Sequence, residues 1–198
     1  MFAYIKGTLQ SKANDYVIVE CNNIGYKIFM PSTSIDKLND LESSVKIYTY
    51  YYVREDNISL YGFLEEEQLR MFELLLSVSG IGAKSANIIL SCITPSAFAL
   101  AIITNDVSQL VKIQGIGPKS AQRIILELKD KVKTDEAVDK NSDIKAALID
   151  DSKSSEAVAA LKVLGYNLKD IEKVIESIDI SSMQVEDIIR QALIKLGR

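Results

Sequence analysis

Two stretches of the chain are near copies of one another: LLSVSGIGAKSANIIL at residues 75–90 and LVKIQGIGPKSAQRII at residues 110–125. They lie 35 positions apart, and seven of the ten positions that begin at Gly80 and Gly115 are identical. The chain contains only nine glycines, so chance does not explain two Gly-Ile-Gly turns in the same context. We infer that one structural unit has been duplicated.

The repeated unit predicts an apolar helix, a Gly-Ile-Gly turn and a second helix that begins immediately after the turn. Glycine permits positive φ and leaves the backbone bare, so the N–H groups at the start of the second helix can together face an anion such as phosphate. A lysine follows at the same position in both copies, where it can add positive charge. The isoleucine between the glycines is expected to pack inward.

This pattern is typical of the helix-hairpin-helix motif. Two copies in tandem can hold both phosphate backbones of a duplex without reading its bases, which predicts DNA binding that is independent of sequence and sensitive to salt. The candidate DNA-binding residues are Ser79, Gly80, Ile81, Gly82, Lys84, Ser85, Gly115, Ile116, Gly117, Lys119, Ser120 and Arg123.

The distribution of charge along the chain agrees with DNA binding, although the net charge of the chain does not. The net charge is −4, which is the wrong sign for a general nucleic-acid binder. Residues 79–133, however, carry seven basic and three acidic side chains, whereas residues 134–198 carry nine basic and thirteen acidic ones. The positive charge is therefore concentrated around the two repeats.

The composition excludes several other classes of function. The 198 residues include no histidine, which excludes Ser-His-Asp triads, Cys-His dyads and histidine-ligated metals. Cys21 and Cys92 lie in no metal or redox spacing and fit a reducing cytoplasm. The longest apolar run, at 97–103, is far shorter than the ~20 residues of a membrane helix, and the start MFAYIKG has no signal-peptide pattern. We expect no cofactor, no metal and no membrane association.

The remainder of the chain predicts a mixed fold, β first and then α. Residues 1–63 alternate short β-branched or tyrosine-rich runs with polar turns, which predicts a five-stranded antiparallel barrel. Residues 64–133 predict helices around the two hairpins, and the charged residues 134–155 predict a flexible acidic linker with at most a weak helix at 144–149. Residues 156–198 predict a small three-helix bundle. The expected strands are 3–9, 16–20, 24–30, 45–53 and 58–61, and the expected helices of the hairpin region include 84–93, 95–103, 107–111 and 119–129.

Over essentially its whole length the chain resembles the RuvA family, the Holliday-junction recognition subunits of bacterial branch-migration machines. The resemblance is carried by both hairpins and by MFAYIKG at 1–7, GYKIFMP at 25–31, VREDNISLYGF at 53–63 and EAVAALKVLGY at 156–166. It implies an OB-like barrel, a domain with paired hairpins and a mobile third domain. It also implies a non-catalytic protein that binds four-way junction DNA as a homotetramer, or as an octamer of two facing tetramers.

The resemblance also implies roles for two further groups of residues. Glu55 and Asp56 match an acidic pin, which repels phosphates from the centre of the junction and helps to hold the strands apart. Leu161, Leu164 and Tyr166 match an apolar surface for RuvB, the hexameric ATPase that drives the arms. Periodicity alone equally allows the two leucines to be core residues, so Tyr166 is expected to be the more exposed contact. RuvC resolvase is a further partner that the resemblance allows.

Two departures from the family pattern affect the expected DNA contacts. Tyr4 stands where many relatives carry a basic residue. Pro118 removes a charge and an N–H group close to the second turn, so Lys119 and Arg123 would have to compensate. No G-x-x-x-x-G-K-[ST] phosphate loop occurs in the sequence, so the energy for branch migration must come from the partner.

The residues leave two other functions open. A helix-hairpin-helix base-excision DNA glycosylase would use Lys119 as a Schiff-base nucleophile, with Asp135 or Asp139 as its carboxylate, although both acids lie in a charged segment without an apolar frame. A covalent adduct through Lys119 with abasic-site DNA and borohydride would favour the enzyme. An interaction scaffold would use the hairpins to hold proteins, and failure to retard a four-way junction at low salt would favour it.

Overall fold

The computed structural model describes residues 2–55, 57–138, 152–180 and 183–196. Its contacts divide the chain into two compact units. The first unit contains Met1–Leu76 and Ile81–Thr94, and the second contains Ser77–Gly80 and Pro95–Arg198. The boundary falls inside the first hairpin, because the residues that lead into its turn belong to the second unit.

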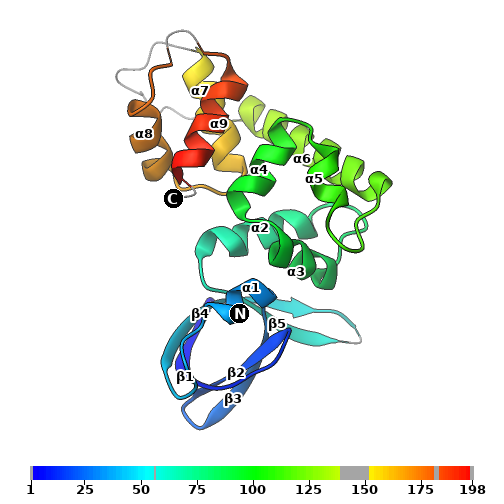
Figure 1. The fold of residues 1–198 in the computed structure, drawn as a ribbon, viewed down its shortest axis with the longest axis vertical. Helices are drawn as coiled ribbons and strands as arrows, with labels where there is room; N and C mark the ends of the chain where they lie inside the picture. Colours follow the sequence, from blue (N-terminus) through cyan, green and yellow to red (C-terminus); the bar gives the residue numbers. More distant parts are fainter. Residues whose placement is uncertain (1, 56, 139–151, 181–182, 197–198) are drawn as a thin grey trace. The chain divides into compact units, whose positions relative to one another are not determined.

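The first unit contains a closed barrel and three helices (Figure 1). The strands are β1 (Tyr4–Lys12), β2 (Tyr16–Cys21), β3 (Ile24–Phe29), β4 (Ser44–Val53) and β5 (Ile58–Phe63), and the helices are α1 (Ser32–Asp36), α2 (Glu66–Leu76) and α3 (Ala83–Cys92). The barrel has the order β1-β2-β3-β5-β4, which confirms the predicted five-stranded OB-like fold. Four pairings are antiparallel as predicted, but β3 and β5 pair in parallel.

The barrel closes because β1 pairs with strands on both sides. Its residues Tyr4–Thr8 pair with β4, Thr8–Lys12 pair with β2, and the register shifts between Leu9 and Ser11. Such an irregularity bends a strand and allows one strand to serve two neighbours. Alternate side chains then point inward, as Val17 and Val19 of β2 do, and both are fully buried in the barrel core.

The barrel supports the two helices of the first hairpin. Phe72 of α2 is fully buried, and its ring lies 5.0–5.4 Å from the rings of Tyr50, Tyr61 and Phe63. Helix α1 contributes hydrogen bonds to both hairpin helices: Ser34 Oγ donates to Gln68 Oε1 of α2 (3.3 Å), and the N–H of Ser32 donates to the hydroxyl of Ser91 on α3 (3.0 Å). These contacts hold α2 against the barrel and link both hairpin helices to α1.

The second unit consists of helices. They are α4 (Pro95–Ile103), α5 (Val107–Val111), α6 (Pro118–Val138), α7 (Ser152–Val163), α8 (Leu168–Glu176) and α9 (Val185–Leu196). Helices α5 and α6 form the second hairpin, and α4 packs against both of them. Helices α7, α8 and α9 pack on one another as the predicted three-helix bundle.

Two features of the second unit differ from the sequence-based expectations. The linker expected at 134–155 is shorter at both ends, because α6 continues to Val138 and α7 begins at Ser152. The rest of this linker, with the weak helix expected at 144–149, lies outside the described residues. In addition, α7 packs against α6 and α9 packs against α4, so the bundle expected as a separate mobile domain is docked in the second unit.

Candidate nucleic-acid interface

Each hairpin turn contains two glycines with different structural roles. The first glycines, Gly80 and Gly115, have φ values of +82° and +86°, which L side chains rarely adopt. The second glycines, Gly82 and Gly117, lie outside this region, and a Cβ atom added to either would find nothing within 4 Å. The fold therefore requires the first glycine of each turn but not the second. Bare backbone at the second glycine leaves room for a group from outside the chain.

The N–H groups of both turns are open to a ligand. Within the described residues, no acceptor receives a hydrogen bond from the N–H of Gly80, Ile81, Gly82, Gly115 or Gly117. The four glycines are exposed, and α3 has no side-chain cap at its N-terminus. Unpaired N–H groups at a helix N-terminus attract an anion through hydrogen bonds and through the helix dipole.

The first turn of each following helix adds only positive charge. Lys84 and Ser85 are the second and third residues of α3, and Lys119 and Ser120 occupy the same places in α6. Both lysines are exposed and both serines are half-buried. Neither helix has an acidic residue in its first turn, although carboxylates are favoured there. The electrostatics of both turns therefore suit an anion from outside the chain.

The two isoleucines of the turns are buried to different extents. Ile116 is 6% exposed, and its N–H donates to the carbonyl of Ile113 (3.0 Å), so it packs inward as expected. Ile81 is only half-buried. The two turns are therefore similar in sequence but not identical in their surroundings.

The surroundings of the first turn include two side chains from α6. The N–H of Ser79 donates to Glu127 Oε2 (3.0 Å), and Arg123 Nη1 donates to the carbonyl of Ser79 (3.4 Å). The N–H of Ser79 is thus already paired, whereas the sequence suggested Ser79 as a DNA contact. Glu127 was missed in the sequence because it lies 48 positions away, and no local pattern signals this contact.

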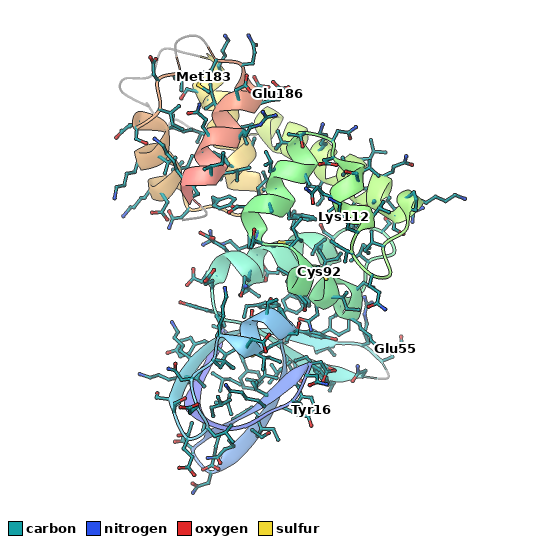
Figure 2. All side chains as sticks on the ribbon, viewed as in Figure 1. Tyr16, Glu55, Cys92, Lys112, Met183 and Glu186 are labelled. Carbon is teal, nitrogen blue, oxygen red and sulfur yellow. The ribbon has the colours of Figure 1, made fainter. Side chains whose placement is uncertain are left out.

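The acidic turn of the β4–β5 hairpin is exposed. Figure 2 shows Glu55 at the tip of this hairpin, where Arg54 and Asn57 exchange backbone hydrogen bonds of 2.8 and 3.4 Å. Arg54 Nε donates to the hydroxyl of Tyr52 (2.9 Å) and its guanidinium lies over that ring. Asp56, the second expected acid of the pin, lies outside the described residues. The structure thus presents one acid of the pair to solvent on a tightly closed turn.

The residues that match the partner surface are buried. Leu161, Leu164 and Tyr166 are 0%, 6% and 4% exposed, so the expectation of an exposed Tyr166 is wrong. The hydroxyl of Tyr166 donates to Ser96 Oγ at the start of α4 (3.1 Å). Tyr166 thus links the C-terminal helices to α4, and the two leucines are part of the core of the second unit. Their role in partner binding stays a prediction.

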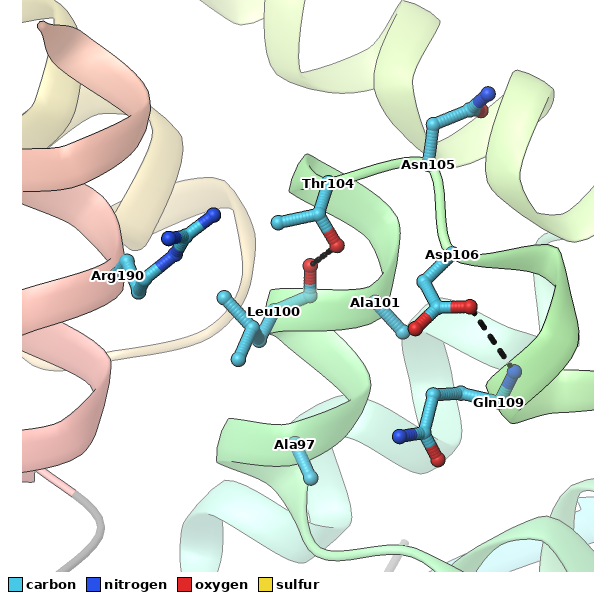
Figure 3. Close-up of a pocket in the computed structure, with 8 residues that line it drawn as sticks. All are labelled: Ala97, Leu100, Ala101, Thr104, Asn105, Asp106, Gln109 and Arg190. Atoms are coloured by element: carbon cyan, nitrogen blue, oxygen red, sulfur yellow. Dashed lines mark hydrogen bonds between the residues drawn. The ribbon is translucent and has the colours of Figure 1, made fainter.

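A hollow of about 580 Å³ lies between α4 and α9 (Figure 3). Arg190 of α9 points into it, opposite Leu100 and Thr104 of α4. Its one acid, Asp106, accepts from the N–H of Gln109 and caps α5. Hydrogen bonds from Ser108 and this N–H hold the pKa of Asp106 below its usual range. The hollow therefore marks where the bundle meets α4, and its acid serves to cap α5.

The described residues hold neither a cluster of metal ligands nor a single membrane-spanning helix. No group of three or more His, Cys, Asp or Glu side chains there could hold a metal ion. In the same ranges, no single helix is long and apolar enough to cross a membrane.

The chain combines an OB-like barrel with two helical hairpins, each of which turns at a Gly-Ile-Gly sequence. This combination defines a class, the helix-hairpin-helix proteins that bind nucleic acids. Comparison with known proteins agrees over three ranges. Residues 1–62 match the RuvA N-terminal domain, residues 72–130 match a SAM-like tandem helix-hairpin-helix, and residues 152–197 match the RuvA C-terminal domain.

Relatives of known type match over the full chain. The chain is 50% identical over 201 residues to the Holliday junction branch migration complex subunit RuvA of Acetivibrio thermocellus, with all of both chains covered. It is 46% identical to the RuvA subunit of Ruminiclostridium cellulolyticum and 44% identical to that of Clostridium botulinum, with 98% of each chain covered. The chain belongs to the RuvA family.

Proposed function

We propose that this protein is the non-catalytic subunit that binds Holliday junctions, holds the four-way DNA open and delivers it to a RuvB ATPase during recombination and repair. The relatives are named as subunits of a branch migration complex, which supports a role in an assembly on junction DNA. No residue is assigned to bond-making chemistry.

The observation that carries the proposal is the second glycine of each hairpin. Gly82 and Gly117 stand in open space with ordinary backbone angles, so the fold alone would accept alanine there. Both are next to N–H groups without acceptors in the described chain and within two residues of an exposed lysine. Close approach of a phosphate backbone explains why this spot is bare, because a methyl group would block it.

The acidic pin supports an open junction more than a continuous duplex. Glu55 is exposed on a turn that extends from the barrel, and a carboxylate there repels phosphate groups. With Asp56 beside it in the sequence, each subunit brings two acids to one loop. A protein that attracts DNA at its hairpins and repels it at this loop favours strands that separate at the centre.

The proposed assembly supplies two things that a single chain lacks: one binding subunit for each arm of the junction and a source of energy. A homotetramer would give one subunit to each arm of the junction, and one or two tetramers would then cover the DNA. RuvB would supply the energy, since the chain has no nucleotide-binding loop, and RuvC is the nuclease that we place on the same complex. The mass of the protein with and without junction DNA distinguishes these assemblies.

The DNA ligand and the two free cysteines fit a cytoplasmic location.

The proposal is tested with the double variant Gly82→Ala, Gly117→Ala. We expect its thermal midpoint to match that of the wild type, because neither added methyl group meets another atom. We expect junction affinity in a gel-retardation titration to fall by about tenfold or more, which corresponds to about 1.4 kcal/mol. The methyl groups would hold the phosphates away from the turn N–H groups.

Gly25→Ala is the matched control. Gly25 is exposed on β3, and a Cβ atom there would meet only Ile18 at an ordinary contact distance of 3.4 Å. This variant should bind the junction as the wild type does. If the double variant also binds as tightly as the wild type, the hairpin turns do not contact DNA and the proposal is wrong.

A further inference from the structure

We propose that the outer face of the barrel carries a second DNA site, which binds single-stranded DNA by stacking its bases on a row of aromatic rings. The row takes one ring from each of four strands: Tyr16 of β2, Phe29 of β3, Tyr61 of β5 and Tyr52 of β4. All four residues belong to the first compact unit. This site would add to the proposed function a ligand and a surface that the hairpin turns do not provide.

The four rings form a continuous row. Tyr16 and Phe29 are paired residues of β2 and β3, and their ring centroids lie 6.1 Å apart. Phe29 and Tyr61 are paired residues of β3 and β5, with centroids 5.7 Å apart, and the ring of Tyr52 lies 5.9 Å from that of Tyr61. These are the separations at which aromatic rings attract one another. The row therefore crosses four neighbouring strands.

The row lies on the outer face of the barrel. Successive side chains of a strand point to opposite faces of the sheet. Val17 and Ile28, which are next to Tyr16 and Phe29 in the sequence, are fully buried in the barrel core. Tyr16 and Phe29 therefore point outward.

Part of the row is left open by the rest of the first unit. Phe72 of α2 covers the ring of Tyr61, with 5.1 Å between their centroids, and Tyr61 is only 9% exposed. Tyr16, Phe29 and Tyr52 are half-buried. These three rings therefore keep surface on which a ligand can stack.

A cation lies at each end of the row. Lys27 Nζ lies 4.0 Å from the ring centroid of Tyr16 and 5.0 Å from that of Phe29. The guanidinium carbon of Arg54 lies 5.2 Å from the ring centroid of Tyr52. Both cations are exposed. Aromatic rings bordered by positive charge suit a single strand, because the rings stack with bases of any sequence and the cations attract its phosphates.

The row also occupies the part of the barrel that suits an oligonucleotide. OB folds bind oligonucleotides on the face of their second and third strands and on the loops that join strands 1 to 2 and 4 to 5. Tyr16 directly follows the first of these loops, Phe29 is on the third strand, and Arg54 directly follows β4. Figure 2 shows Tyr16 and Glu55 on the same side of the barrel. The row thus extends from one loop to the other.

A purely structural row is the alternative, because cross-strand aromatic pairs also stabilise a sheet. The two roles predict different results when the rings are removed. A structural row would lose stability and leave the affinity for single strands unchanged. A stacking site loses that affinity in a variant that still folds.

The test measures the binding of a fluorescent oligothymidylate of about 16 nucleotides, which does not pair with itself, by fluorescence anisotropy. The double variant Tyr16→Leu, Phe29→Leu keeps apolar side chains but loses both rings. We expect its affinity for the oligothymidylate to fall about tenfold or more, because each stacked base contributes to binding. Tyr16→Phe keeps the ring and should bind as the wild type does.

Tyr4→Leu is the matched control. Tyr4 is an exposed tyrosine of β1 with Lys46 Nζ 4.7 Å from its ring centroid, but it lies outside the row. Its removal should leave the affinity for the oligothymidylate unchanged. If the double variant does not fold, photo-crosslinking of the wild type to an oligonucleotide that contains 5-iodouracil replaces it. Mass spectrometry should then find crosslinks at Tyr16, Phe29 or Tyr52.

The hairpin variant Gly82→Ala, Gly117→Ala separates this site from the proposed function. It should bind the oligothymidylate as the wild type does, although it binds the junction more weakly. Wild-type affinity in the Tyr16→Leu, Phe29→Leu variant, crosslinks only outside the row, or a wild type that does not bind the oligothymidylate would overturn the inference. Each of these results would leave the proposed function intact, because that function is tested on the junction with the hairpin variant.

Discussion

At the level of single residues, the acidic turn of the β4–β5 hairpin opposes the charge of DNA. Glu55 is exposed there, and Asp56 follows it in the sequence. The variant Glu55→Gln, Asp56→Asn removes both charges while it keeps the size of the side chains. We expect junction affinity to be equal or higher, because repulsion is lost, and the rate of RuvB-driven branch migration to change.

Competition gel retardation measures the affinity in this experiment, and strand exchange on a labelled junction measures the rate. A large loss of affinity in the double variant would contradict a repulsive role, since it would mean that the two carboxylates contribute to binding. An unchanged rate would show that the turn has no part in opening the junction.

The residues of the turns illustrate what sequence can and cannot reveal at this scale. The glycine pairs and the lysines that follow them could be predicted because their spacing is local and occurs twice. The hydrogen bonds of Ser79 could not, since they depend on a helix that begins 39 positions later and on side chains from that helix. Periodicity allowed Leu161 to be core or surface, and only its packing shows that it is core.

At the level of elements, α7 is the helix whose expected role changes most. Leu161 is fully buried, and Tyr166 beyond the end of the helix is hydrogen-bonded to Ser96. We expect Leu161→Ala to lower the free energy of unfolding by about 2–5 kcal/mol, as large-to-small changes in a core do. Tyr166→Phe, which loses one hydrogen bond but keeps the ring, should lower it by about 1 kcal/mol.

Urea unfolding followed by circular dichroism measures both losses. If Leu161→Ala kept its full stability but lost RuvB binding, the leucine would be a surface contact in solution, against the packing described here. Leu168, exposed at the start of α8, provides a control, because Leu168→Ala should have only a small effect on stability.

Most helices and strands could be predicted from the periodicity of their apolar residues, but the pairing of the strands and the full length of α6 could not. The five strands appear within a few residues of the predicted ranges. The parallel pairing of β3 with β5 has no signal in either strand, because it results from closing the barrel. Helix α6 extends beyond the predicted range into residues 130–138, where lysine and glutamate favour helix although the apolar stripe has ended.

At the level of the whole molecule, an acidic protein is proposed to bind the most acidic of biopolymers. The excess of basic side chains in residues 79–133 resolves this contradiction, because the two lysine-bearing turns lie in that range. Net charge alone would have excluded DNA, whereas the duplicated turns predict where the DNA lies. When a protein binds phosphates, counterions are released from the DNA. The logarithm of the binding constant should therefore fall steeply and linearly with the logarithm of the salt concentration.

The salt dependence of junction affinity is therefore the most direct test of the account. The measurement compares the wild type with the double variant Lys84→Ala, Lys119→Ala over a series of salt concentrations. We predict weaker binding and a shallower slope of log K against log salt, by about two phosphate contacts per subunit. An identical slope for both proteins would show that neither turn holds a phosphate and would contradict the account.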